Sequence, residues 1–99
     1  MAFYTYLLAS QKNGTLYAGH TDDLRTRVFE HKQGRGAAFT RQHNVERLVG
    51  FGVYETREAA KIKEYQIKKW KRGWKIRLIE EANPDWRDLY PDLNNTLGF

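Results

Sequence analysis

Arg27 and His31 stand where helix packing would call for hydrocarbon side chains. A helix that begins near Thr21 has one stripe, spaced by three and four residues, that holds Leu24, Arg27, Val28 and His31. Each polar residue has an ordinary explanation, because Arg27 can pair with Asp23 and His31 suits a helix C-terminus. Together they break the packing pattern twice, which is typical of a functional site. An arginine directed at a sheet face is suited to stabilising charge on a phosphoryl group in its transition state.

A second candidate group is Glu64, a carboxylate inside a lysine-rich segment. On a helical projection Glu64 lies about 40° from Ala60, at the edge of an apolar stripe, and the lysines around it are Lys61, Lys68 and Lys71. An ordinary ion pair with Lys68, four residues later, is one interpretation. The alternative is a divalent metal, because Mg²⁺ commonly uses one or two protein carboxylates together with waters and substrate phosphates.

Two tyrosines complete the set of candidate groups. The segments 3–9 and 16–19 predict strands, and the dipeptide Asn13-Gly14 between them predicts a hairpin with a two-residue loop. Paired positions then sum to 27, so one face carries Tyr4, Tyr6, Leu8, Tyr17, Gly19 and Thr21. Gly19 would leave an opening beside Leu8. Most strand tyrosines are core or surface filler, but a phenol whose pKa is lowered by cations can accept a proton or act as a nucleophile.

The remaining elements place these groups in one small domain. The helix after Thr21 or Asp22 is expected to stop near Gly34, and the segments that follow are a basic glycine-rich loop (34–44), a strand (47–55), a helix (56–72, ending at Gly73) and a short helix (74–82). The predicted fold class is α+β, with a small three-stranded antiparallel sheet flanked by helices. We expect residues 1–82 to form the domain and the acidic tail 83–99 to pack on it.

Composition favours a globular protein with an anionic partner. The chain has 99 residues, 14 aromatic residues, no cysteine and a net charge of +5. Residues 80–99 carry a net charge of −4, which leaves +9 on the rest of the chain. A positive surface of this kind attracts polyanions such as nucleic acids. The absence of cysteine, of a long apolar run and of a secretory signal pattern predicts a cytoplasmic protein without disulfides.

The ordered motifs resemble the GIY-YIG nuclease family, and most closely its branch of small single-domain bacterial proteins. The segments that carry the resemblance are "YTY", "YAG", "HTDDLRTRVFEH", "GRGAAFTR", "ETREAAKIKEYQIKKWKR" and "KIRLI", between residue 3 and about residue 80. Two positions depart from the family pattern, because Tyr4 replaces the leading glycine of the first motif and Ala18 replaces the isoleucine of the second. Neither departure falls on a reacting group.

The resemblance implies roles for particular side chains. Tyr6, Tyr17, Arg27, His31 and Glu64 match the family's catalytic positions, and Gly19 matches the glycine of the second motif. It implies in-line attack of water on a phosphodiester, with one Mg²⁺ or Mn²⁺ ion on Glu64 and the phosphate on Arg27. A tyrosine would activate the water or stabilise charge, and the choice between Tyr6 and Tyr17 stays open. Asn83 is a candidate for a late asparagine that lines the family's site, although a turn before Pro84 also explains it.

We therefore expect a metal-dependent DNA endonuclease, structure-selective or weakly sequence-specific, with a role in DNA repair, recombination or processing. Its specificity would depend on DNA shape, a partner protein or a homodimer. The residues expected to contact nucleic acid are Gly19, Thr21, Arg35, Arg41, Lys68, Lys69, Lys71 and Arg72. One alternative is a nucleic-acid-binding module without turnover, which would stack bases on the sheet tyrosines. Another is a protein-interaction module that docks through the acidic tail, and that tail could also cover the basic surface.

Overall fold

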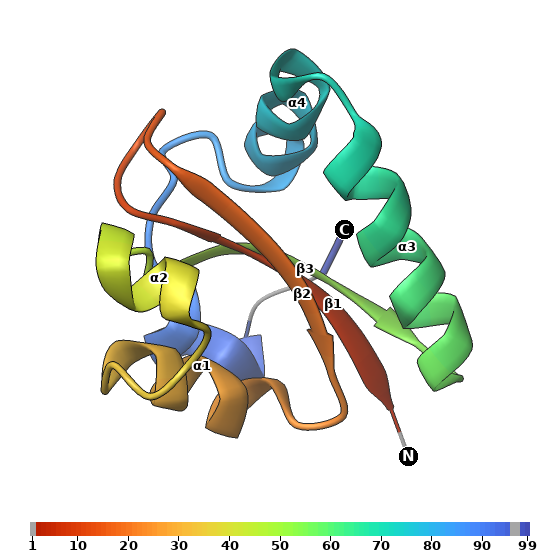
Figure 1. Cartoon of the computed structure of the whole chain (residues 1–99). Coiled ribbons are helices and arrows are strands. Elements are labelled where there is room, and N and C mark those ends of the chain that lie inside the picture. The colour runs from red at the N-terminus through yellow and green to blue at the C-terminus, as the bar shows by residue number, and fades with distance from the viewer. Residues whose placement is uncertain (1, 96–97) are drawn as a thin grey trace.

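The computed structural model describes residues 2–95 and 98–99 of the chain. A three-stranded antiparallel sheet lies between two groups of helices (Figure 1). Its strands are β1 (Phe3–Ala9), β2 (Leu16–Thr21) and β3 (Arg47–Tyr54), in the order β2-β1-β3. One side carries α1 (Leu24–Lys32), α2 (Ala38–His43) and the short 3₁₀ segment η1 (Tyr90–Asn95), and the other carries α3 (Arg57–Lys69) and α4 (Arg72–Ala82). The predicted α+β class is confirmed.

The hairpin between β1 and β2 forms, but its register differs from the prediction. Tyr6 lies opposite Gly19 and Leu8 lies opposite Tyr17, so the paired numbers sum to 25. Four residues, 11–14, make the loop, since the Ser10 amide donates to the Thr15 carbonyl at 3.0 Å. The predicted two-residue turn requires a positive φ at both central positions, whereas the loop has one such non-glycine residue, Asn13, at 58°. The shift is an even number of residues, so the predicted face assignment survives.

Alternate strand residues feed two separate apolar layers. The layer on the α1 side contains Tyr6, Leu8, Leu24, Val28, Val45, Leu48, Phe51 and Leu89. The layer on the α3 and α4 side contains Leu7, Ala9, Ala18, Val49, Ile67, Ile79 and Trp86. The period of two in β1 therefore divides its side chains between both faces of the sheet, as expected for a central strand.

Two helical boundaries differ from the sequence prediction. The segment expected to be a loop contains α2, whose Thr40 is buried and whose last turn is followed by Asn44 in the left-handed region. The long helix was expected to end at Gly73, yet α3 ends at Lys69 because Trp70 and Lys71 adopt extended backbone angles. Gly73 lies in the first turn of α4. The predicted Thr56 cap is present, with its hydroxyl accepting from the Ala59 amide at 3.1 Å.

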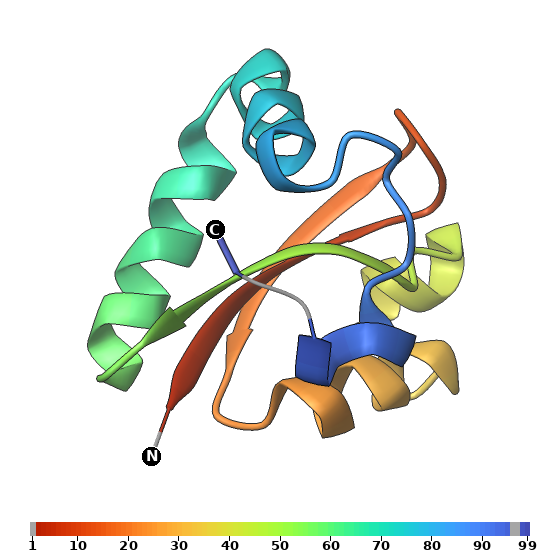
Figure 2. The same cartoon turned by 180° about the vertical axis from the view of Figure 1, so that it is seen from behind.

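The C-terminal segment continues from α4 to the α1 side of the sheet (Figure 2). Trp86 is fully buried, and its indole N–H donates to Glu80 at 2.8 Å. The Leu89 amide donates to the Leu48 carbonyl at 2.8 Å, on the outer edge of β3. Asp88 accepts hydrogen bonds from Lys32 and from the Leu48 amide. This segment lies along β3, at the edge of the sheet opposite β2.

None of the helices in the described part of the chain is both long and apolar enough to cross a membrane.

Candidate active site

A buried chain of hydrogen bonds joins β1 to α1 and α2. The hydroxyl of Tyr6 lies 3.1 Å from Nε2 of His31, and Nδ1 of His31 lies 2.9 Å from Oγ1 of Thr40. The Thr40 hydroxyl donates its own proton to the Ala37 carbonyl at 2.8 Å. Oγ1 of Thr40 must therefore accept from Nδ1–H of His31, which leaves Nε2 to accept from Tyr6. The contacts fix both the histidine tautomer and the direction of every proton in the chain.

Burial sets the protonation states of this chain. His31 is 3% exposed, and its burial, with the nearby Arg27 cation, lowers its pKa from 6.5 to about 4. Tyr6 is 1% exposed, and burial raises its pKa to about 12 against the opposing influence of Arg27. At neutral pH the imidazole is therefore neutral and the phenol is protonated, which is the state that the hydrogen bonds require.

Two glycines give these rings their space. A Cβ atom at Gly19 would lie 2.5 Å from the Tyr6 hydroxyl oxygen, and one at Gly36 would lie 2.2 Å from Nδ1 of His31. The opening predicted at Gly19 is therefore filled by the phenol of Tyr6 rather than left for a ligand. Gly36 has the matching role in the turn between α1 and α2, where its backbone lies against the imidazole.

Arg27 points from α1 toward the same face of the sheet. Its guanidinium lies 3.3 Å from the Glu30 carboxylate, and both side chains are partly exposed. Asp23, the partner expected from the sequence, instead caps α1 by accepting from the Thr26 amide at 3.2 Å. The neighbouring Tyr6 phenol helps to raise the pKa of Arg27. Arg27 is thus a cation beside the buried phenol, with an edge open to solvent.

Tyr17 forms the solvent side of the cluster at the outer edge of β2. Its ring centroid lies 6.5 Å from that of Tyr6 and 5.6 Å from that of His31. Phe39 of α2 stacks on it at 6.2 Å, and Nζ of Lys68 lies 5.9 Å from the ring centroid. A hollow of about 260 Å³ at this edge is lined by Tyr17, Phe39, Lys68 and five further residues. Helices from both sides of the sheet therefore meet at one surface.

Glu64 reaches that edge from the opposite side of the sheet. Its Oε2 accepts from Nζ of Lys68 at 2.5 Å, and its Oε1 lies 2.6 Å from Nδ1 of His20. Burial alone would raise the pKa of Glu64, but the hydrogen bonds from Lys68 and His20 outweigh it and hold the pKa below its ordinary value. Glu64 is therefore ionised. No three histidine or acidic side chains converge on a metal position anywhere in the described part of the chain, so Glu64 and His20 stand as a pair.

Sequence reasoning missed His20. The signal was present, because His20 alternates with Gly19 and Thr21 and so faces α3, and Glu64 was already a candidate on that helix. The rotation of α3 about its axis decides which strand residue meets the carboxylate, and local sequence pattern does not define that rotation.

The residues expected to contact nucleic acid have different surroundings. Exposed cations are found at Arg35, Arg41, Lys68, Lys69 and Lys71. Arg72 instead donates to the carbonyls of Asn13 and Gly14, at 2.8 and 2.6 Å, and so ties α4 to the hairpin loop. The Thr21 hydroxyl accepts from the Asp23 amide at 3.1 Å.

Asn83 has a structural setting. Its side-chain amide donates to the carbonyls of Val49 and Arg87, at 3.2 and 2.9 Å, and its carbonyl oxygen accepts from the Arg87 amide at 3.2 Å. The side chain is buried among these partners where α4 ends. The turn explanation therefore accounts for Asn83, and we do not include it in the candidate site.

Comparisons with known proteins identify the family of this chain. The family model of the GIY-YIG catalytic domain matches residues 2–77. A UPF0213 protein of Haloquadratum walsbyi is 40% identical over 79 residues, which cover 80% of this chain and 88% of the relative. A UPF0213 protein of Staphylococcus aureus is 41% identical over 69 residues, which cover 70% of this chain and 84% of the relative.

The fold is also found in a solved structure. The solution NMR structure of a UPF0213 protein from Bacillus halodurans is 32% identical and covers 89% of this chain and 93% of its own, with a TM-score of 0.55. The residues that match the family model include all three strands, with the tyrosines on β1 and β2, and the helix α3 that carries Glu64. The chain is similar to the UPF0213 proteins, and it belongs to the GIY-YIG family of nucleases.

Proposed function

We propose that this protein is a divalent-metal-dependent endonuclease that hydrolyses phosphodiester bonds in DNA, with structure-selective or weakly sequence-specific recognition. One observation carries the proposal. Tyr6, Tyr17 and His31 cluster beside the Arg27 cation, and the ionised Glu64 approaches the same edge of β2 from the other side of the sheet. A cation that can stabilise charge on a phosphoryl group and a carboxylate that can hold a divalent ion suit phosphodiester hydrolysis.

Arg27 and the two tyrosines have distinct roles in this proposal. Arg27 binds a non-bridging oxygen of the phosphate and stabilises the charge that develops there. Tyr17 is the phenol that meets the substrate, since Tyr6 is 1% exposed and its hydroxyl is committed to His31. Water attacks phosphorus and releases a proton to solvent, one P–O ester bond breaks, and the leaving oxygen takes up a proton from solvent. The hydrogen bonds among Tyr6, His31 and Thr40 hold the Tyr6 phenol and the His31 imidazole in place in their neutral forms.

Glu64 is the residue that would hold the divalent ion. Its donor set fits, because a single ionised carboxylate together with waters and substrate phosphate is a common Mg²⁺ environment. Lys68, half exposed, can leave Oε2 and turn toward a phosphate. When bound, the ion supplies positive charge to the phosphoryl oxygens and favours attack by water.

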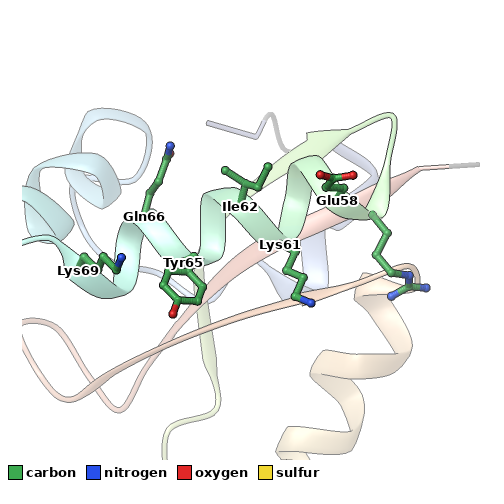
Figure 3. Close-up of a pocket in the computed structure, with 7 residues that line it drawn as sticks. Glu58, Lys61, Ile62, Tyr65, Gln66 and Lys69 are labelled. Atoms are coloured by element: carbon green, nitrogen blue, oxygen red, sulfur yellow. The ribbon is translucent and has the colours of Figure 1, made fainter.

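Basic and aromatic side chains on α3 support a nucleic-acid substrate. An open surface hollow of about 800 Å³ runs along this helix, and its lining includes Lys61, Tyr65 and Lys69. Lys61 and Tyr65 extend from the same side of α3, while Glu58, Ile62 and Gln66 extend from the other (Figure 3). Nζ of Lys69 lies 4.6 Å from the centroid of the exposed Tyr65 ring. Such mixed surfaces hold phosphates with the cations and bases with the rings.

The proposal is tested by cleavage of branched, nicked and plasmid DNA with and without Mn²⁺. We expect metal-dependent cleavage that falls at least 100-fold in Glu64→Gln and in Arg27→Ala, while DNA binding persists. The matched controls are Glu58→Gln on the same helix and Arg25→Ala on α1, and both should cleave normally. Unchanged cleavage by Glu64→Gln would remove the metal role, and cleavage with equal rates in EDTA would contradict the mechanism.

A second candidate is binding of nucleic acid without turnover. The rings of Tyr17, Phe39 and His43 form a continuous series at the edge of β2, with the Phe39 and His43 centroids 4.5 Å apart, and Phe39 is 43% exposed. Each stacked base would contribute about 1–3 kcal/mol. This function predicts salt-dependent binding that weakens in Phe39→Ala and no nicking with any divalent ion. A role in DNA repair or processing in the cytoplasm would suit either candidate.

A further inference from the structure

His20 occupies a position that is polar without an obvious packing reason. It lies on β2 opposite Thr5, and both side chains face α3. The Thr5 hydroxyl donates to the Ala60 carbonyl at 2.6 Å, and His20 meets Glu64 one helical turn later. On the same face, Leu7, Ala9 and Ala18 belong to the apolar layer. His20 and Thr5 thus form a polar strip between the sheet and α3.

The contact between His20 and Glu64 has a defined direction. An ionised carboxylate has no proton to donate, so Nδ1 of His20 carries the proton and Oε1 accepts it across 2.6 Å. The side chains are 26% and 16% exposed, so the bond is shielded from solvent on most sides. Lys68, the partner of Oε2, is 51% exposed. One oxygen of Glu64 is therefore held by a largely buried strand residue and the other by a half-exposed surface lysine.

We infer that His20 is a positioning residue for the metal carboxylate: its Nδ1–H fixes Oε1 of Glu64 and directs Oε2 toward the cation. This inference rests on the proposed function, in which Glu64 holds a divalent ion. Carboxylates that bind metals are themselves oriented by hydrogen bonds, and loss of such an outer partner typically lowers metal affinity about 10–100-fold. The strand supplies the orientation here because a β2 backbone moves less than an exposed lysine side chain.

The competing explanation is that His20 only ties α3 to the sheet. Thr5 offers a matched control for that explanation, because its bond to Ala60 ties the neighbouring strand β1 to the same helix, one turn away. Thr5→Val removes that tie and keeps a β-branched side chain in the strand. A purely structural role for His20 predicts that His20→Val and Thr5→Val behave alike. The positioning role predicts that they differ in metal affinity.

The test measures Mn²⁺ affinity of the whole chain by calorimetry and by electron paramagnetic resonance, without DNA. Five proteins are compared: the wild type, Glu64→Gln, His20→Val, His20→Asn and Thr5→Val. Asparagine places an N–H near the position of Nδ1, so it should restore the hydrogen bond. We expect Glu64→Gln to abolish the site and His20→Val to weaken it about 10–100-fold. His20→Asn should bind Mn²⁺ within about threefold of the wild type, because its N–H replaces Nδ1–H as the partner of Glu64. Thr5→Val should bind Mn²⁺ as the wild type does, because Thr5 bonds to Ala60 and not to the carboxylate.

The outcomes separate this inference from the proposed function. If Glu64→Gln abolishes Mn²⁺ binding while His20→Val binds normally, the inference about His20 is overturned and the metal role of Glu64 stands. If Glu64→Gln leaves binding unchanged, both fail together. Weak binding by His20→Asn as well as His20→Val would also overturn the inference, since the restored N–H would then have no effect. Thermal unfolding of each variant shows whether a lost affinity reflects lost structure.

Discussion

The Tyr6 hydroxyl donates to Nε2 of His31 across 3.1 Å, and this bond joins the central strand of the sheet to α1. It exists because both groups are neutral, with the pKa of Tyr6 raised to about 12 and that of His31 lowered to about 4. A protonated imidazole would have no lone pair on Nε2 for the phenol. At His31, the stripe of α1 is therefore joined to the sheet by a buried hydrogen bond in place of an apolar contact.

The first prediction concerns pH. Unfolded His31 takes up a proton near pH 6.5 and folded His31 only near pH 4, so between these values the unfolded state binds more protons. Stability must then rise with pH across this window and be lost as the pH falls through it, by at most about 3 kcal/mol. Urea unfolding at pH 7 and pH 4.5 should show a smaller loss in His31→Asn than in the wild type. Equal losses in the two proteins would refute the role of His31.

The second prediction compares two glycines. Gly36→Ala should destabilise the protein by about 1–3 kcal/mol, because overpacking beside a fixed group forces a shift, and the new Cβ would lie 2.2 Å from His31. Gly73→Ala should be neutral or stabilise by up to about 1 kcal/mol, since its Cβ meets nothing within 4 Å in α4. Chemical denaturation of both variants provides the measurement. A stable Gly36→Ala protein with an unperturbed His31 ring signal in NMR would contradict the packing described at this turn.

The third prediction concerns Lys68. Removing its ammonium frees Oε2 of Glu64, so Lys68→Met should bind Mn²⁺ more tightly than the wild type, by about 2–5-fold for a half-exposed ion pair. The same variant should bind DNA less tightly and with a weaker dependence on salt. Lys69→Met is the control, because Lys69 lies over Tyr65 and should affect DNA binding alone. Lower Mn²⁺ affinity in Lys68→Met would show that the lysine does not compete with the ion.

The fourth prediction concerns residues 83–99, which we propose fold as part of the same domain. Trp86 is fully buried in the layer that also contains Ile67 and Ile79. Trp86→Ala should therefore cost about 3–5 kcal/mol, and a fragment of residues 1–82 should be unfolded or nearly so at 37 °C. Thermal unfolding followed by circular dichroism measures both. A well-folded fragment with raised DNA affinity would instead support the idea that the acidic tail restrains binding.

The sequence predicted the parts of this molecule that depend on local pattern. The hairpin, the third strand and the Thr56 cap follow from turn, strand and capping preferences of single residues, and each is present. A helix carrying Arg27 and His31 on one stripe was also predicted and is present, but Asp23 caps it, where the sequence favoured Thr21 or Asp22. Face assignment in the hairpin survived an error in register because strand side chains repeat every two residues.

The remaining features depend on contacts between distant segments. No glycine or proline follows Lys69 directly to mark the end of α3, whereas Gly73 suggests a helix end at a later position. The hydrogen bond from His31 to Thr40 requires α2 to fold back over α1. The glycine-rich composition of residues 34–44 predicts a loop and does not indicate this helix. His20 could be identified only after α3 was oriented about its axis against β2.

The two edges of the sheet differ in a way that limits how this protein can assemble. The outer edge of β3 is occupied by the chain itself, through Leu89 and Phe99, whose amides donate to Leu48 and Phe51. Tyr17 and Lys68 lie at the outer edge of β2 and line the hollow there, so a strand added at that edge would fill this hollow. Growth of the sheet into a second molecule is thus blocked at one edge and would close the candidate site at the other.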